Sequence, residues 1–123
     1  MREAISQAAL GPATMTSESA EQSFFFQDSF IGFAGHFPGY PILPAILQTL
    51  LAQMLAEQMI GEPLQFLALN RAKFRRELRP NEQINITLNC RVLKEHLHFA
   101  TELRVADETA ASFTLVLGKG TTE

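Results

Sequence analysis

Residues 33–47 read FAGHFPGYPILPAIL, and an apolar run continues from there to residue 60. His36 lies among prolines and glycines in this stretch, so we expect a stiff loop that gives the imidazole ring a defined direction. Pro44 suits the start of a helix, which leaves the backbone N–H of Ala45 and its neighbours without intrahelical acceptors. A fixed imidazole beside a helix start is a candidate base next to a candidate oxyanion site. The alternative is a proline-rich turn in which His36 is only hydrogen-bonded.

Residues 43–60 predict one long buried helix. The apolar residues follow helical spacing, and alanines at 45, 52 and 56 widen the stripe: Leu43, Ile46, Leu47, Leu50, Leu51, Met54, Leu55 and Met59. A helix that is apolar over most of its circumference must be covered by other structure. Polar interruptions, including Gln48 and Glu57, argue against a membrane span. Residues 61–63, GEP, end the helix.

Strict alternation of apolar and polar residues over 83–92 predicts a half-buried antiparallel strand. Further strands are predicted at 65–76, 97–105 and 113–117, with turns near 94–96 and 106–108. Residues 13–27 predict a strand that enters the core at 24–26, and residues 1–10 are interpreted as a first strand. One buried helix followed by antiparallel strands predicts an α+β fold. A curved antiparallel sheet then wraps one long central helix, in a single domain over residues 1–123.

The composition is that of an ordinary globular protein. The chain has 123 residues, of which 46% are hydrophobic and 19% are charged, with a formal net charge of −3. This charge argues against a nucleic-acid partner. A single cysteine, Cys90, excludes an internal disulfide and is typical of a reducing compartment. The N-terminal residues lack the pattern of an export signal. We therefore expect a cytoplasmic protein.

Two segments carry a resemblance to a known family. Residues 35–44, GHFPGYPILP, resemble the active-site signature of the 3-hydroxyacyl-(acyl carrier protein) dehydratases of type II fatty acid synthesis. Residues 72–76, AKFRR, with Pro80 and Gln83 after them, are similar to a second block of that family. The match covers roughly residues 22 to 118. It implies the hotdog fold and a homodimer or higher oligomer. It also implies a substrate carried on the phosphopantetheine of an acyl carrier protein, with no other cofactor.

The resemblance also assigns roles to particular residues. It implies that His36 removes the α-proton of a 3-hydroxyacyl thioester and that the Ala45 N–H binds the developing oxyanion. The family places Asp or Glu fourteen positions after the histidine, and this chain has Leu50 there. Gln53, one turn further on, is a candidate substitute, although an amide is no acid. Glu57 lies about 10 Å along the axis from Leu50, too far to substitute directly.

Aromatic and basic residues complete the candidate site. The resemblance implies that Phe74 lines an acyl tunnel. Phe33, Phe37 and Leu50 are candidates for the same acyl pocket, although core packing explains the phenylalanines equally well. Basic residues gather within 71–79 and are candidates for docking the acidic carrier protein: Arg71, Lys73, Arg75, Arg76 and Arg79. The alternative for this basic cluster is a solvated strand edge protected by charge.

We predict no metal site. His96 and His98 share one face of a predicted strand, whereas Cys90 belongs to the inward series of another strand. Three functions remain open. The first is a 3-hydroxyacyl-carrier dehydratase of fatty acid or polyketide-like synthesis, with low activity because of Leu50. The second is a non-catalytic or half-site subunit whose hetero-oligomeric partner, a second dehydratase-like chain, supplies the acid. The third is an acyl thioesterase.

Overall fold

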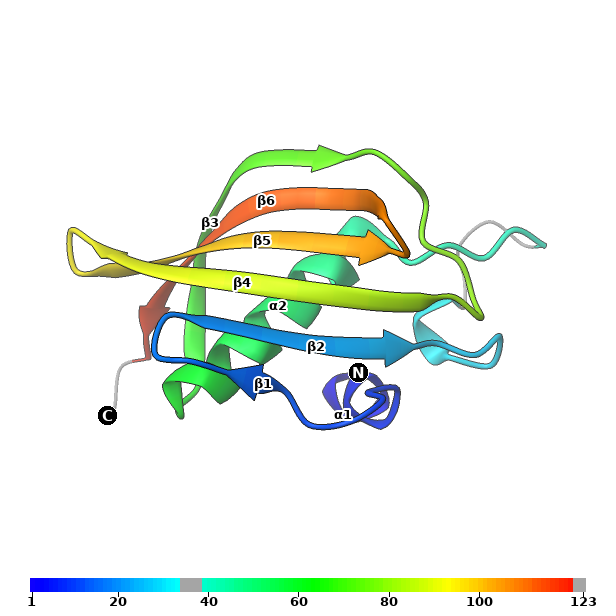
Figure 1. Cartoon of the computed structure of the whole chain (residues 1–123), viewed down its shortest axis with the longest axis horizontal. Coiled ribbons are helices and arrows are strands. Elements are labelled where there is room, and N and C mark those ends of the chain that lie inside the picture. Colours follow the sequence, from blue (N-terminus) through cyan, green and yellow to red (C-terminus); the bar gives the residue numbers. More distant parts are fainter. Residues whose placement is uncertain (34–38, 121–123) are drawn as a thin grey trace.

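The structure is a computed structural model that describes residues 1–33 and 39–120. A six-stranded sheet curves around one long helix, α2 (Figure 1). The strand order is β1-β2-β4-β5-β6-β3, and every neighbouring pair is antiparallel. The elements in chain order are α1 (Arg2–Gln7), β1 (Thr14–Met15), β2 (Ser19–Phe25), a short 3₁₀ helix (Ile31–Phe33), α2 (Ala45–Ile60), β3 (Leu64–Phe74), β4 (Gln83–Leu93), β5 (His96–Val105) and β6 (Glu108–Lys119). This is the predicted hotdog fold.

The ends of α2 follow the sequence signals closely. Pro44 is the N-cap residue, with an extended backbone at φ −68° and ψ 155°, and the helix begins at Ala45. Gly61 closes the helix in the left-handed conformation at φ 87°, a geometry that glycine adopts without steric cost. The helix predicted for residues 43–60 is therefore confirmed, with its first turn two residues later than expected.

The core lies between α2 and the concave face of the sheet. From α2 the buried residues are Gln48, Leu51, Ala52, Leu55 and Ala56. The sheet contributes the inward members of its alternating strands, including Ile84, Ile86, Leu88, Phe99 and Leu103, each at most 1% exposed. The alternation predicted for β4 to β6 is confirmed in the middle of each strand. It fails at the end of β4, where Val92 is 66% exposed, and over residues 115–118 of β6, which are all buried.

The prediction of a strand over residues 1–10 is wrong. Arg2–Gln7 forms the short helix α1, which buries Ile5 against the core. The spacing of Ile5, Ala8 and Ala9 is helical, and this spacing outweighs the partial alternation that suggested a strand. Only the residues after α1 pair with the sheet: the Leu10 N–H donates to the Ser23 carbonyl, and Ala9 forms an isolated bridge with Phe24.

Strand β3 leaves apolar side chains uncovered. It lies at one end of the sheet order and pairs with β6. Phe66, Leu67, Leu69 and Phe74 are each at least 36% exposed, and Ile46 at the start of α2 is 74% exposed. The helix expected to be covered on most sides is therefore uncovered mainly at its start, because Ala45, Ile46 and Gln58 are its exposed residues. Within the described residues, neither helix is long and apolar enough to cross a bilayer.

The buried stripe of α2 predicts where the helix is sensitive to truncation. Leu55 is fully buried, so Leu55→Ala should lower the free energy of unfolding by about 2–5 kcal/mol, through lost burial and the cavity left behind. Gln58 lies exposed on the same helix, and Gln58→Ala should change that free energy by less than about 1 kcal/mol. Urea denaturation of both variants is the measurement, and equal losses would contradict this placement of α2.

Candidate functional site

The candidate site lies at the N-terminal end of α2. Ala45 and Ile46 occupy the first two helical positions, where backbone N–H groups have no intrahelical acceptor. No side chain of the described residues caps this end of the helix. A pocket of about 230 Å³ opens here, and its lining includes Pro44, Ala45, Gln48, Phe74 and Arg75. The predicted oxyanion donor therefore lies in the wall of a pocket.

The segment that leads into α2 is tied to the loop after β3. The Leu43 N–H donates to the Leu78 carbonyl at 2.7 Å. The Arg79 guanidinium lies over the Tyr40 ring, 4.4 Å from its centroid, and both side chains hydrogen-bond to Glu77. These contacts hold the approach to the helix in one position, so the donors at its start are preorganised. Arg79, a predicted docking residue, is thus engaged by Tyr40 and Glu77.

Gln48 is a member of this site that the sequence reasoning overlooked. Its side chain is buried, and Nε2 donates to the Leu43 carbonyl at 3.0 Å. Among the described residues, Oε1 is the buried side-chain atom that has no hydrogen-bond partner. A glutamine within the apolar pattern of a helix does not reveal which of its amide atoms will lack a hydrogen-bond partner. The sequence signal was only that a polar residue interrupts the stripe one turn after Pro44.

The other predicted site residues are not gathered in one place. His36 and Phe37 lie outside the described residues. Phe33 is buried in the core, with its ring edge-on to Phe30, and Phe74 lines the pocket beside Ala45. Leu50 is partly buried and packs against the core cluster. The Gln53 side chain donates to the Leu64 carbonyl at 2.9 Å. An acyl pocket formed jointly by Phe33, Phe37, Leu50 and Phe74 stays a prediction.

The basic cluster divides between the outer face of the sheet and the pocket at the start of α2. Arg71 and Lys73 line a hollow with Thr87, Asn89 and other outward-facing residues, on the side away from α2. A bulge between Asn70 and Lys73, with Arg71 at φ 54°, lies at this point of β3. Arg75 and Arg76 instead line the pocket at the start of α2. Only the second pair lies beside the candidate site.

Arg76 is neutralised by ion pairs. Its guanidinium contacts the Glu82 carboxylate at 2.5 Å and the Glu108 carboxylate at 3.0 Å. These carboxylates raise the pKa of Arg76, and the Arg76 hydrogen bonds are the main cause that lowers the pKa of Glu82 below its ordinary value of 4.5. Arg75 has no ion pair among the described residues, so its charge is the one left available at the pocket.

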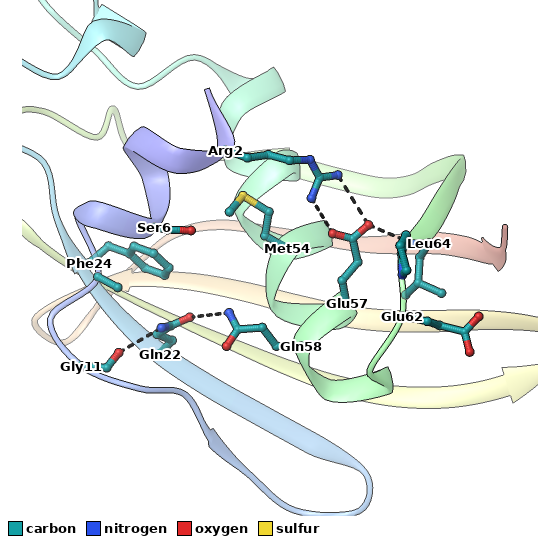
Figure 2. Close-up of a pocket in the computed structure, with 12 residues that line it drawn as sticks. Arg2, Ser6, Gly11, Gln22, Phe24, Met54, Glu57, Gln58, Glu62 and Leu64 are labelled. Atoms are coloured by element: carbon teal, nitrogen blue, oxygen red, sulfur yellow. Dashed lines mark hydrogen bonds and ion pairs between the residues drawn. The ribbon is translucent and has the colours of Figure 1, made fainter.

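A larger cavity of about 1020 Å³ lies toward the other end of α2, between α1, β2 and the start of β3 (Figure 2). The Glu57 carboxylate occupies one side of it, where it accepts hydrogen bonds from Arg2 at 2.5 Å and from the Leu64 backbone N–H at 2.9 Å. Glu57 thus ties three elements together. Because α2 rises 1.5 Å per residue, this cavity lies roughly 15 Å from Ala45. It is larger than the pocket at the start of α2, but it does not contain the predicted oxyanion donor.

The side chains of His98 and Cys90 lie on opposite faces of the sheet. Cys90 lies opposite the buried Phe99, whereas His98 lies opposite the exposed Arg91. Burial raises the pKa of the Cys90 thiol, which disfavours the thiolate that binds zinc. Among the described residues, no group of three potential metal ligands occurs.

Comparison with known proteins identifies the family. A family model described as ApeI-like, ApeI dehydratase, matches residues 13–114. The chain belongs to this ApeI-like dehydratase family. The resemblance found in residues 35–44 and 72–83 is therefore confirmed.

The curated relatives of this ApeI-like protein include 3-hydroxyacyl-[acyl-carrier-protein] dehydratases. A 3-hydroxyacyl-[acyl-carrier-protein] dehydratase from Fusobacterium nucleatum is 31% identical over 69% of this chain and 66% of its own length. One from Syntrophobacter fumaroxidans is 38% identical over 46% of this chain and 44% of its own length. The chain thus spans about half to two thirds of these curated relatives.

Solved structures support the fold of the ApeI-like chain. The dehydratase heterocomplex ApeI:P from Xenorhabdus doucetiae aligns with a TM-score of 0.76 at 22% identity, covering 90% of this chain and 96% of that one. The protein PH1136 from Pyrococcus horikoshii aligns with a TM-score of 0.72 at 10% identity, covering 92% and 85%. At these identities the likeness concerns the fold alone.

The Arg76–Glu82 pair predicts a pH dependence of stability. Because the pKa of Glu82 is lowered in the folded state, the pair stabilises the fold above the unfolded-state pKa, and this contribution is lost as pH falls through the folded-state pKa. The difference in unfolding free energy between wild type and Glu82→Gln should therefore be constant near neutral pH and shrink below about pH 4.5. Urea denaturation from about pH 7 to about pH 3 measures it, and a difference that does not change with pH would contradict the ion pair.

Proposed function

We propose that this chain is a subunit of a dehydratase that removes water from 3-hydroxyacyl thioesters held on an acyl carrier protein. The observation that carries the proposal is the uncapped start of α2, where the Ala45 N–H lies in the wall of a pocket. The family signature in residues 35–44 runs directly into this helix start. The substrate brings its own phosphopantetheine arm, and the reaction proposed here uses no further cofactor.

The proposed reaction begins at the carbon next to the thioester carbonyl. His36 takes the α-proton as general base, and the electron pair left behind is delocalised onto the carbonyl oxygen. The Ala45 N–H donates a hydrogen bond to that oxygen as its negative charge develops. Replacing the family's glycine by Ala45 keeps this donor, because the backbone is helical there. The enolate then reforms the carbonyl, the C2–C3 double bond forms and the 3-hydroxyl leaves.

The leaving hydroxyl needs a proton, and α2 offers none at the family's position. Leu50 has no ionisable group, and its side chain packs against the core. The Gln53 amide donates to the Leu64 carbonyl, so it is already engaged in linking α2 to β3. We therefore propose that this chain holds the base and the oxyanion donor but lacks the acid.

A half-site subunit in a hetero-oligomer is the second candidate, and the uncovered apolar side chains support it. Ile46, Phe66 and Leu69 are exposed along α2 and β3, where a second chain can cover them. A partner seated there would reach the N-terminal half of α2 and could present an acid beside Leu50. The structure from Xenorhabdus doucetiae with the same fold is described as a dehydratase heterocomplex, ApeI:P.

Carrier docking is proposed at Arg75. This side chain is exposed beside the pocket, and the phosphate of the carrier arm is a natural partner for a guanidinium. Arg76 lies next to it but is paired with Glu82 and Glu108. Arg71 and Lys73, on the other face, would contribute only to the long-range attraction of an acidic protein.

The missing acid predicts low activity of the chain alone. Formation of the 2-enoyl product from a carrier-bound 3-hydroxyacyl substrate should be slow for wild type and absent for His36→Ala. Leu50→Glu should raise the rate, by at most roughly 10²–10⁴, if its carboxyl group reaches the leaving hydroxyl. It should also lower stability, because a carboxyl group replaces a partly buried leucine.

Mass spectrometry of the products separates the candidates. Turnover that requires a co-expressed dehydratase-like partner, with Leu50 unchanged, would favour the half-site subunit over the self-sufficient enzyme. Release of the free 3-hydroxy acid and thiol would identify a thioesterase instead. Turnover that persists in His36→Ala would contradict the dehydratase proposal as a whole.

Docking at Arg75 predicts a charge-dependent loss of carrier binding. Arg75→Glu should weaken binding of an acidic carrier protein about 5- to 50-fold at low salt, and less at high salt, because salt screens charges near the surface. Arg91→Glu is the matched control, since Arg91 is exposed near the end of β4. The β4–β5 turn that follows lies at the opposite end of the molecule from the start of α2 (Figure 1). Isothermal titration over a salt series tests this, and equal effects of the two variants would contradict a local docking site.

A further inference from the structure

We infer that Gln48 is a substrate-binding residue: its Oε1 accepts a hydrogen bond from a donor group of the bound thioester, within the pocket that holds the Ala45 N–H. The inference rests on the proposed function and adds a specificity-determining residue to it. Its basis is a buried acceptor, Oε1, that has no partner among the described residues and belongs to a side chain lining a pocket beside the start of α2.

The orientation of the Gln48 amide follows from its surroundings. Nε2 lies 3.0 Å from the Leu43 carbonyl oxygen, and exchanging the two amide atoms would place two acceptors against each other. The carbonyl end of the amide is therefore the end left without a partner. Gln48 is 5% exposed, so bulk water does not solvate Oε1 freely. A buried acceptor without a partner costs free energy, and a ligand donor would recover it.

The scaffold around Gln48 holds the amide in place. Leu43, which binds Nε2 through its carbonyl, is itself held by the hydrogen bond from its N–H to the Leu78 carbonyl. The Gln48 N–H in turn donates to the Pro44 carbonyl at 3.1 Å. The side-chain amide and the backbone N–H of Gln48 are thus both hydrogen-bonded to the segment that leads into α2. An acceptor held so firmly can discriminate between ligands, because little ordering remains to be done on binding.

The pocket combines two kinds of polar group. The start of α2 presents donors, at Ala45 and Ile46, and Gln48 presents an acceptor one turn further along. A ligand that satisfies both must carry an acceptor and, within a few bonds of it, a donor. A carrier-bound 3-hydroxyacyl thioester has this pattern. Its carbonyl oxygen is the acceptor, and its donors are the 3-hydroxyl on one side and the nearest amide N–H of the arm on the other.

Four small thioesters separate the two donors. They are the N-acetylcysteamine and ethanethiol esters of 3-hydroxyhexanoic acid and of hexanoic acid. N-acetylcysteamine supplies the amide N–H and 3-hydroxyhexanoic acid supplies the hydroxyl, so the four esters carry both donors, either one alone, or neither. Dissociation constants from ligand-observed NMR are compared for wild type and Gln48→Met. Methionine removes the acceptor while keeping similar volume. Thr49→Val is the matched control, because Thr49 also donates from α2 to a backbone carbonyl, that of Ile46 at 2.8 Å.

In wild type, the ester that carries the recognised donor should bind about 2- to 10-fold more tightly than the ester that lacks it. This advantage should vanish in Gln48→Met and persist in Thr49→Val. Loss of the hydroxyl advantage would assign the 3-hydroxyl as the donor, and loss of the cysteamine advantage would assign the amide. Thermal unfolding of each variant confirms that the fold is kept.

Three results would overturn the inference. They are unchanged selectivity in Gln48→Met, an equal loss of affinity for all four esters, and a wild-type protein that binds none of them. The dehydratase activity is judged separately, from product formation. Selective binding that depends on Gln48 without any enoyl product would support this inference while contradicting the proposed reaction.

Discussion

A helix enclosed by one curved sheet can be covered on only part of its circumference, and this constraint governs the rest of the structure. Leu51, Ala52, Leu55 and Ala56 meet the concave face of the sheet and are completely buried. Ile46, on the same helix, is 74% exposed. The sequence of α2 is apolar on more sides than its own sheet can cover. The apolar side chains that the sheet leaves uncovered lie along α2 and the outer strand β3, where a second chain would complete their burial.

The same constraint places the candidate site. The sheet covers the middle of α2, so the first turn emerges where its cover ends, and the helix donors there meet a pocket rather than the core. The site would be poorly defined if the approach to the helix moved freely. Two contacts restrict this motion: the Leu43 N–H donates to the Leu78 carbonyl, and the Tyr40 ring lies under the Arg79 guanidinium. Arg79 thus has a structural task as well as a charge.

Patterns of burial could be predicted from the sequence, whereas pairings of polar groups could not. The periodicity of α2, its end at Gly61 and the alternation of β4 over residues 83–89 each follow from which residues avoid water, and the structure confirms them. The helix at residues 2–7 was missed because a six-residue element carries too little periodicity to decide. The division of the basic cluster depends on a bulge at Arg71, and the ion pairs of Arg76 depend on residues from other segments. Nothing in the sequence near Gln48 indicates that one atom of its amide lacks a partner.

Leu50 and Ala45 show how differently the two halves of the proposed reaction depend on side chains. The oxyanion donor is a backbone N–H, which any residue except proline supplies, so the change from the family's glycine leaves it intact. The acid is a carboxyl group, which one substitution removes completely. A chain can therefore keep the signature of residues 35–44 and the helix that follows it while losing the proton donor. In the proposed reaction, the part that remains favours binding and enolate formation, and the proton for the leaving hydroxyl comes from outside α2. The uncovered face beside Ile46 is where a second chain could supply it.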